Sequence, residues 1–214
     1  MWRTGPILCL AALLAAGAAA AQDRTTPQAG DQPSPAEARA AERKAERLEE
    51  KAAEGATPPR AERITGAEAQ AVDPAGAKPL DDPLTCLART VYWEARGGTQ
   101  AAMEAIASVV MNRVGKAGFP DTVCGVVRQG EEAGACQFSW WCDGRPDAAE
   151  EPAEYALAKE IAREALNGQL RDRTGGALYF HGADGPAPAW AGAYVRTAAI
   201  GGHVFLKPRD GAAR

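Results

Sequence analysis

The sequence predicts a small, mainly helical α+β domain with a late β-hairpin, preceded by a disordered tether. Three observations lead to this prediction. Residues 22–80 contain few large apolar side chains. Residues 83–166 hold three segments with the 3.6-residue spacing of buried helices, and two short β-type runs bounded by glycines follow them. Helices followed by strands in this order are typical of an α+β domain.

Residues 1–21 have the three parts of a secretory signal peptide. Arg3 supplies the positive charge, an apolar run covers residues 7–21, and Ala19-Ala20-Ala21 directly precede Gln22. The apolar run of about 15 residues is shorter than the roughly 20 residues that cross a bilayer. We therefore expect a cleaved signal, no stable membrane span afterwards, and a protein that is secreted, periplasmic or associated with the cell wall.

Residues 22–80 are rich in Ala, Pro, Glu and Arg. Their large aliphatic residues are Leu48, Ile64, Val72 and Leu80. So few apolar groups are not expected to offset the entropy of ordering the segment. Residues 37–54 have high helix propensity but no apolar heptad, which predicts a solvated single helix in a flexible tether. A specific binding arm is the alternative.

The domain is expected to cover residues 81–214 and to begin with two helices. The first starts at Pro83 and ends before Gly97 and Gly98. Its apolar stripe consists of Leu84, Leu87, Ala88, Val91 and Ala95. Thr99 can cap a second helix that runs to about Val114. One face of this helix carries Met103, Ile106, Val110 and Val114.

A third helix and a hairpin complete the predicted domain. The helix covers about residues 152–166, with acidic residues in its first turn and Asn167-Gly168 at its end. The β-type runs are residues 177–180 and 203–206. The connection between them contains Pro186, Pro188 and Trp190.

Four cysteines remain once the signal peptide, with Cys9, is removed. In an oxidising compartment they predict two disulfides. Zinc ligands usually come in pairs with two to four residues between them, whereas Cys136 and Cys142 have five. We therefore expect no metal site and no cofactor. Three pairings stay open; Cys86–Cys124 with Cys136–Cys142 is preferred because it would tie the first helix to the loops that follow.

Glu94 is the strongest candidate for chemistry. It lies three residues after Val91, at the border of the apolar stripe, and in the last turn of its helix. Burial and the negative end of the helix dipole both disfavour a carboxylate and should raise its pKa. A carboxyl group that stays protonated near neutral pH can act as a general acid. The alternative is an ion pair with Arg89 or Arg96.

The net charge limits the partners. The chain carries a formal charge of −4 and has a pI of about 5.4. A nucleic-acid partner is therefore not expected, because such proteins usually present a basic surface.

The segment around Glu94 resembles the SleB/CwlJ family of cell-wall hydrolases. The resemblance rests on LARTVYWEARGGTQAAMEAIASVVMNRV, GFPDTVCGVV, CQFSWWCDG, GGALYFHG and IGGHVFL, which occur in the family's order over residues 84–206. One departure is Gly98, where the family often has a glutamate. The resemblance implies a lysozyme-like domain with peptidoglycan as its partner. The bond cleaved would join N-acetylmuramic acid to N-acetylglucosamine, with Glu94 as general acid/base.

The number of carboxylates bears on the mechanism. A hydrolase usually needs a second carboxylate. Asp143 and Asp147 are the nearest candidates, but no spacing argument selects either. With one clear acid, attack by the sugar's own 6-hydroxyl is the simpler route, so a lytic transglycosylase is preferred. A muramidase and a non-catalytic peptidoglycan-binding module are the alternatives. An amidase is disfavoured because the histidines are few and the cysteines are expected to be disulfide-bonded.

Other polar and aromatic residues are predicted to bind the glycan. Gln137 and Ser139 lie in the loop between two cysteines, while Tyr179 and His181 share one face of a strand if Phe180 is buried. The remaining candidates are Trp190, within a segment that resembles the family, and His203. Trp140 or Trp141 is a further candidate, as a stacking platform. Arg96 and Arg113 could orient Glu94 or pair at helix ends, and helix-end pairing is preferred. Asn112 is interpreted as a residue that supports the fold.

Overall fold

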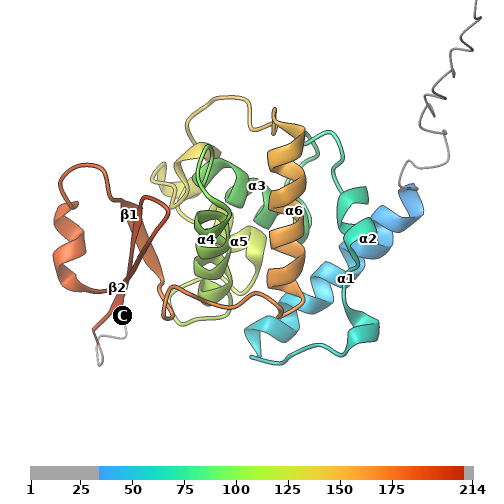
Figure 1. Cartoon of the computed structure of the whole chain (residues 1–214), viewed down its shortest axis with the longest axis horizontal. Helices are drawn as coiled ribbons and strands as arrows, with labels where there is room; N and C mark the ends of the chain where they lie inside the picture. Colours follow the sequence, from blue (N-terminus) through green and yellow to red (C-terminus); the bar gives the residue numbers. More distant parts are fainter. Residues whose placement is uncertain (1–33, 210–214) are drawn as a thin grey trace, which may run out of the picture. The chain divides into compact units, whose positions relative to one another are not determined.

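The computed structural model describes residues 34–209, drawn in colour in Figure 1. The predicted signal peptide, residues 22–33 and residues 210–214 lie outside the described residues. Helices dominate, and a small antiparallel sheet follows them in the chain. This confirms the predicted fold class.

The helices come first in the chain, and the three strands of the sheet come last. The helices are α1 (Pro35–Ala53), α2 (Gly66–Ala71), α3 (Pro83–Glu94), α4 (Gln100–Arg113), α5 (Val123–Arg128) and α6 (Pro152–Leu166). The strands are β1 (Tyr179–Gly182), β2 (Tyr194–Ile200) and β3 (His203–Pro208). Short 3-10 turns lie between them at Arg60–Glu62, Glu131–Ala133, Ser139–Trp141 and Ala189–Ala193.

Helix α3 forms the centre of the core and ends at the site. Asp82 caps it by accepting a hydrogen bond from the Thr85 amide at 2.9 Å, and Pro83 occupies its first turn. All ten residues from Pro83 to Tyr92 are buried. The helix packs against α4, α5 and α6 (Figure 1). The Asp82 cap and the packing against three helices hold α3 in place, and α3 in turn positions Glu94.

Helices α4 and α6 agree with their predicted bounds. Thr99 caps α4 through the Ala102 amide, and α6 starts at Pro152 and is followed by Asn167. The buried Asn167 side chain bonds both the amide and the carbonyl of Ile64. These ends were predictable because capping depends on local residue chemistry.

The sheet has the order β1-β3-β2 and is antiparallel throughout. The two predicted β runs do pair, with Phe180 opposite Phe205. However, the hairpin itself consists of β2 and β3, joined at Gly201 and Gly202. Both glycines have positive φ, and a Cβ on Gly201 would collide with Ala102 of α4. Strand β2 was missed because its sequence, YVRTAAI, shows weak alternation after a connection rich in proline and glycine.

A disordered tether was predicted over residues 22–80. For residues 34–80 this prediction is wrong, because they form helices that pack in the core. We call residues 34–82 the N-terminal arm. A capping box formed by Ser34 and Glu37 starts α1, whose inner face is made largely of alanines. The arm contributes Ala41, Ala45, Leu48, Ile64, Ala69, Val72 and Leu80 to the buried core. Counting large apolar residues missed this packing, because alanines allow close approach of helices.

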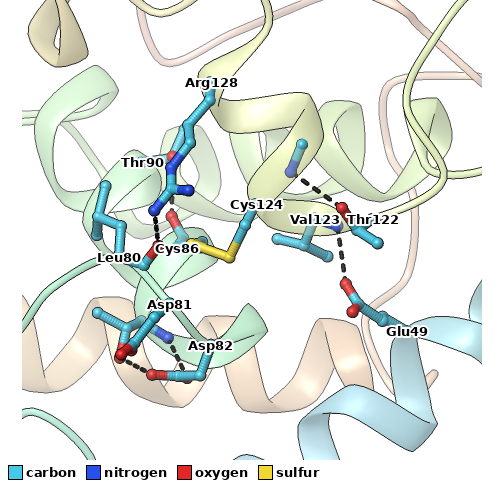
Figure 2. The surroundings of a disulfide bond; sticks show 12 residues. Glu49, Leu80, Asp81, Asp82, Cys86, Thr90, Thr122, Val123, Cys124 and Arg128 are labelled. Atoms are coloured by element: carbon cyan, nitrogen blue, oxygen red, sulfur yellow. Dashed lines mark hydrogen bonds between the residues drawn. A yellow bond between two sulfur atoms is a disulfide. The ribbon is translucent and has the colours of Figure 1, made fainter.

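Buried polar contacts attach the arm to the rest of the domain. The Asp73 carboxylate accepts hydrogen bonds from Arg89 of α3, at 2.8 and 3.1 Å, and from the Tyr155 hydroxyl of α6, at 2.6 Å. In Figure 2 the Glu49 carboxylate points to the backbone amide of Val123 at the start of α5, at 2.8 Å. Such contacts between distant segments have no local signal in the sequence.

The four cysteines form the preferred pairing. Cys86 of α3 is bonded to Cys124 of α5 (Figure 2), and Cys136 to Cys142 across a short loop. The first disulfide therefore joins two core helices, and the second closes a loop that reaches the site. Among residues 34–209, no helix is long and apolar enough to cross a membrane.

Candidate active site

A pocket of about 490 Å³ lies where the end of α3, the 136–139 loop and the sheet meet. Its wall comprises Glu94, Arg113, Cys136, Gln137, Ser139, Tyr179, Phe180, His181, Gly182, Trp190 and Tyr194. Six of the seven residues predicted to form the site therefore line one cavity, although they come from three separate parts of the chain.

Glu94 is the last residue of α3 and reaches the pocket from the core side. Its residue is partly buried, and within residues 34–209 no group donates a hydrogen bond to its carboxyl group. Burial raises the pKa of Glu94 to about 7, against the opposing effect of the positive charge on Arg113. Near neutral pH the carboxyl group is thus protonated in a large fraction of molecules and can donate a proton.

Arg113, the last residue of α4, also lines the pocket. Its Nε donates to the Leu178 carbonyl at 2.7 Å, and its guanidinium lies 5.2–5.7 Å from three aromatic ring centres. Those rings belong to Phe119, Phe138 and Tyr179. The interpretation of Arg113 as a helix-end pairing residue is wrong, because no described carboxylate lies within 4.0 Å of it. Arg96, in contrast, does pair with Glu151.

The loop between Cys136 and Cys142 presents Gln137 and Ser139 to the pocket. The backbone amide of Gln137 donates to the Gln129 carbonyl at 2.9 Å, and the fully buried Phe138 anchors the loop in the core. Both polar side chains are exposed. The disulfide and Phe138 hold this loop in place. Among the described residues, the side-chain amide of Gln137 and the hydroxyl of Ser139 have no partner and can bind a ligand.

Aromatic residues cover the sheet side of the pocket. The ring of Tyr179 lies 4.4 Å from that of Tyr194 and 6.2 Å from that of Trp190. The His181 ring stands edge-on to Trp190 at 5.9 Å. Trp190 is 43% exposed, which is unusual for so large a ring and makes it available for stacking.

Several predicted site residues lie elsewhere. His203 does not line the pocket; its Nδ1 lies 3.2 Å from the Gly201 carbonyl and its ring packs on Phe180. Trp140 is buried, and neither it nor Trp141 lines the pocket. Asp143 and Asp147 line a separate cavity of about 90 Å³.

The sequence analysis preferred another part for Arg113 and did not include Phe180 or Tyr194 among the site residues. For Arg113 a signal existed, because it lies three residues after Val110 and seven after Ile106, on the buried face of α4. Tyr194 begins the strand that was not predicted. Asn112 fits its predicted structural part, since its amide bonds the Ala177 carbonyl at 3.2 Å. Residues 34–209 hold no group of three or more potential metal ligands.

The fold is mainly helical, and its polar and aromatic pocket holds one carboxyl group with a raised pKa, which are the features of a general-acid site. Comparison with known proteins identifies the family. The chain belongs to the cell wall hydrolase family, whose model matches residues 97–206. This confirms the resemblance found in the sequence. The match begins three residues after Glu94 and includes every other residue of the pocket wall.

The chain is also similar to curated spore cortex-lytic enzymes. It is 33% identical to that of Halalkalibacterium halodurans over 58% of this chain and 34% of the relative. It is 34% identical to that of Bacillus cereus over 58% of this chain and 44% of the relative. The chain thus spans less than half the length of these relatives.

Two solved structures are similar as well. One is the catalytic domain of the germination-specific lytic transglycosylase SleB from Bacillus anthracis, at 32% identity and a TM-score of 0.48, covering 58% of this chain and 93% of that one. The other is the catalytic domain of the Bacillus cereus SleB protein, at 33% identity and a TM-score of 0.47, covering 58% of this chain and 89% of that one.

Proposed function

We propose that this protein cleaves the glycan strand of peptidoglycan between N-acetylmuramic acid and N-acetylglucosamine, as a lytic transglycosylase with Glu94 as general acid/base. The observation that carries the proposal is the raised pKa of Glu94, at about 7, in a pocket of about 490 Å³. Membership of the cell wall hydrolase family and similarity to spore cortex-lytic enzymes support a peptidoglycan substrate.

The pocket's chemistry supports the lytic route over hydrolysis. Glu94 is the one carboxylate among the described residues of the wall, whereas hydrolysis usually requires a second one. Glu94 donates its proton to the glycosidic oxygen as the bond from that oxygen to the anomeric carbon breaks. The resulting carboxylate takes the proton of the 6-hydroxyl while that oxygen bonds the anomeric carbon. The products are a 1,6-anhydro end and a free hydroxyl, and no water is consumed.

The remaining wall residues suit a sugar. Gln137 and Ser139 are placed to hydrogen-bond hydroxyl or acetamido groups, and Trp190 and Tyr179 offer aromatic faces for the ring. We propose Tyr194 as a further contact, because it packs against Tyr179 within the same wall. His181 is proposed as a hydrogen-bonding group beside Trp190. His203 is not included, since its ring packs on Phe180 outside the pocket wall.

Product analysis of the Glu94→Gln variant tests the mechanism. The variant keeps the shape of the side chain but cannot transfer the proton, so turnover of purified peptidoglycan should fall about 100- to 10,000-fold. Mass spectrometry of wild-type digests should show 1,6-anhydromuramoyl ends, which are lighter than hydrolysed ends by one water molecule. Wild-type turnover by Glu94→Gln would refute the proposal.

Two aspartate variants distinguish the lytic route from the muramidase alternative. Asp143→Asn and Asp147→Asn remove the two carboxylates that the sequence offered as a second catalytic group, which line a different cavity. Both variants should keep most of the wild-type rate and the same anhydro products. Loss of activity in either variant, together with reducing ends in wild-type digests, would instead favour hydrolysis with a second carboxylate.

The cellular location proposed from the sequence is outside the cytoplasm, in the periplasm or the cell wall. It is supported by the signal-peptide pattern of residues 1–21 and by two disulfides, which persist in oxidising compartments. N-terminal sequencing of the exported protein should find Gln22 first, and an uncleaved N-terminus would contradict the proposal.

A further inference from the structure

The guanidinium of Arg113 is an unusual group to find in this wall. Arg113 is only 3% exposed, and its Nε is held by the Leu178 carbonyl. Its Nη1 is enclosed and has no hydrogen-bond partner among the described residues. A buried charge of this kind is normally paired or fully hydrogen-bonded, because leaving it without a partner destabilises the fold.

The pocket contains one group that can compensate this charge. Burial lowers the pKa of Arg113 to about 10, so the side chain is still positive at neutral pH. The other titratable residues of the wall are His181, Tyr179 and Tyr194. None of these side chains carries a carboxylate. Deprotonated Glu94 is therefore the available counter-charge in the described wall.

We propose that Arg113 is a positioning residue that stabilises the carboxylate form of Glu94 between the two proton transfers of the reaction. This inference rests on the proposed function. When Glu94 gives its proton to the glycosidic oxygen, a negative charge appears in a partly buried place. Arg113 lies in the same wall without an anionic partner and compensates that charge until the 6-hydroxyl returns a proton.

The arrangement explains why Arg113 is held away from a direct contact. An ion pair within hydrogen-bond distance would keep Glu94 ionised and useless as an acid. Instead no ion pair within 4.0 Å joins the two described side chains. The Leu178 carbonyl and the rings of Phe119 and Phe138 fix the guanidinium where it can stabilise the carboxylate from a distance. Glu94 can then serve as acid first and as base afterwards.

The test compares three variants of the whole chain. Arg113→Gln removes the charge, Arg113→Lys retains it, and Arg96→Gln is the matched control, since Arg96 is an exposed arginine two residues from Glu94 that pairs with Glu151. The measurements are the pH profile of kcat on purified peptidoglycan and the titration of the Glu94 carboxyl carbon by ¹³C NMR, assigned by its absence in Glu94→Gln.

Variants with and without the positive charge at position 113 should differ in the pH profile of kcat. The acid form of Glu94 starts the reaction, so wild-type kcat should fall above a pH of about 7. In Arg113→Gln, the pH at which kcat falls and the midpoint of the Glu94 titration in the NMR spectrum should both rise by about one pH unit or more. The maximal rate should fall at least about tenfold, because a weaker acid donates more slowly. Arg113→Lys and Arg96→Gln should keep both close to their wild-type positions.

If Arg113→Gln is folded and neither the pH at which kcat falls nor the Glu94 titration midpoint changes, the inference is overturned, even if the rate falls. If that variant fails to fold, replacement of Arg113 by citrulline keeps the shape and the Nε donor to Leu178 but removes the charge, and the same shift is expected. The titration needs no substrate. Thus an active Glu94→Gln would reject the proposed function, whereas an unmoved Glu94 titration would reject only the part played by Arg113.

Discussion

At the scale of single residues, the site separates what a local pattern can predict from what packing adds. The raised pKa of Glu94 was predictable because two local features, its place beside an apolar stripe and its place in the last turn of a helix, both disfavour a carboxylate. Arg113 was misinterpreted, because a charged residue at the end of a helix is usually solvated or paired. Its place in the pocket wall depends on contacts with rings from a loop and a strand, which lie far away in the chain.

The raised pKa of Glu94 predicts that the candidate active site costs stability. Between its ordinary value of 4.5 and about 7, the folded chain keeps a proton that the unfolded chain has lost. The free energy of unfolding therefore falls as the pH rises through this window, at up to about 1.4 kcal/mol per unit, and stays low above it. Glu94→Gln removes the effect and should be more stable than wild type at pH 8, on the order of 2 kcal/mol after allowing for partial exposure.

Urea denaturation of both proteins from pH 4 to pH 8 measures this difference. At pH 4 the carboxyl group is protonated in both the folded and the unfolded chain, so the two curves should nearly coincide. A stability difference that did not depend on pH would contradict the raised pKa.

At the scale of elements, helix ends were predictable and β-pairing was less so. Asp82, Thr99 and Pro152 mark the starts of α3, α4 and α6 through chemistry within one turn. Strand β2, in contrast, exists because β3 pairs with it and because Gly201 permits the turn against α4. Neither condition is visible in YVRTAAI itself. Six pocket residues come from the sheet and from the connection between β1 and β2, whose positions depend on such pairing.

The two disulfides are expected to serve different elements. Cys86–Cys124 closes a separation of 38 residues and joins α3 to α5, so its loss should cost about 3–4 kcal/mol. Cys136–Cys142 closes a separation of only 6 residues, beside Gln137 and Ser139. Its double serine variant should lose less stability but should bind substrate more weakly, with a higher KM.

Unfolding curves and kcat/KM for the two double serine variants check this division. The Cys86/Cys124 variant should keep its KM under conditions where it is still folded. An unchanged KM in the Cys136/Cys142 variant would show that the short loop is held by Phe138 and its other contacts rather than by its disulfide.

At the scale of the described chain, the N-terminal arm is the main difference between expectation and structure. The family match covers residues 97–206, so the arm lies outside it. Yet the arm is in the same core as α3, through Leu48, Ile64 and Val72, and its Asp73 holds the buried Arg89. Composition did not reveal this, because each contact needs a partner on α3, α5 or α6 that only the folded chain supplies.

This packing predicts that the arm and the matched region unfold as one unit. Leu48 is 1% exposed, and Leu48→Ala should lower the free energy of unfolding by about 2–5 kcal/mol. Glu46→Ala, at an exposed position of the same helix, is the control and should change it little. A chain that starts at Pro83 loses the counter-charge of Arg89 and the cover of α3, so it should no longer show a cooperative transition. Urea denaturation followed by circular dichroism measures all three. If the shortened chain unfolded cooperatively at the wild-type midpoint, the arm would contribute nothing to the core, and Glu94 would be positioned without it.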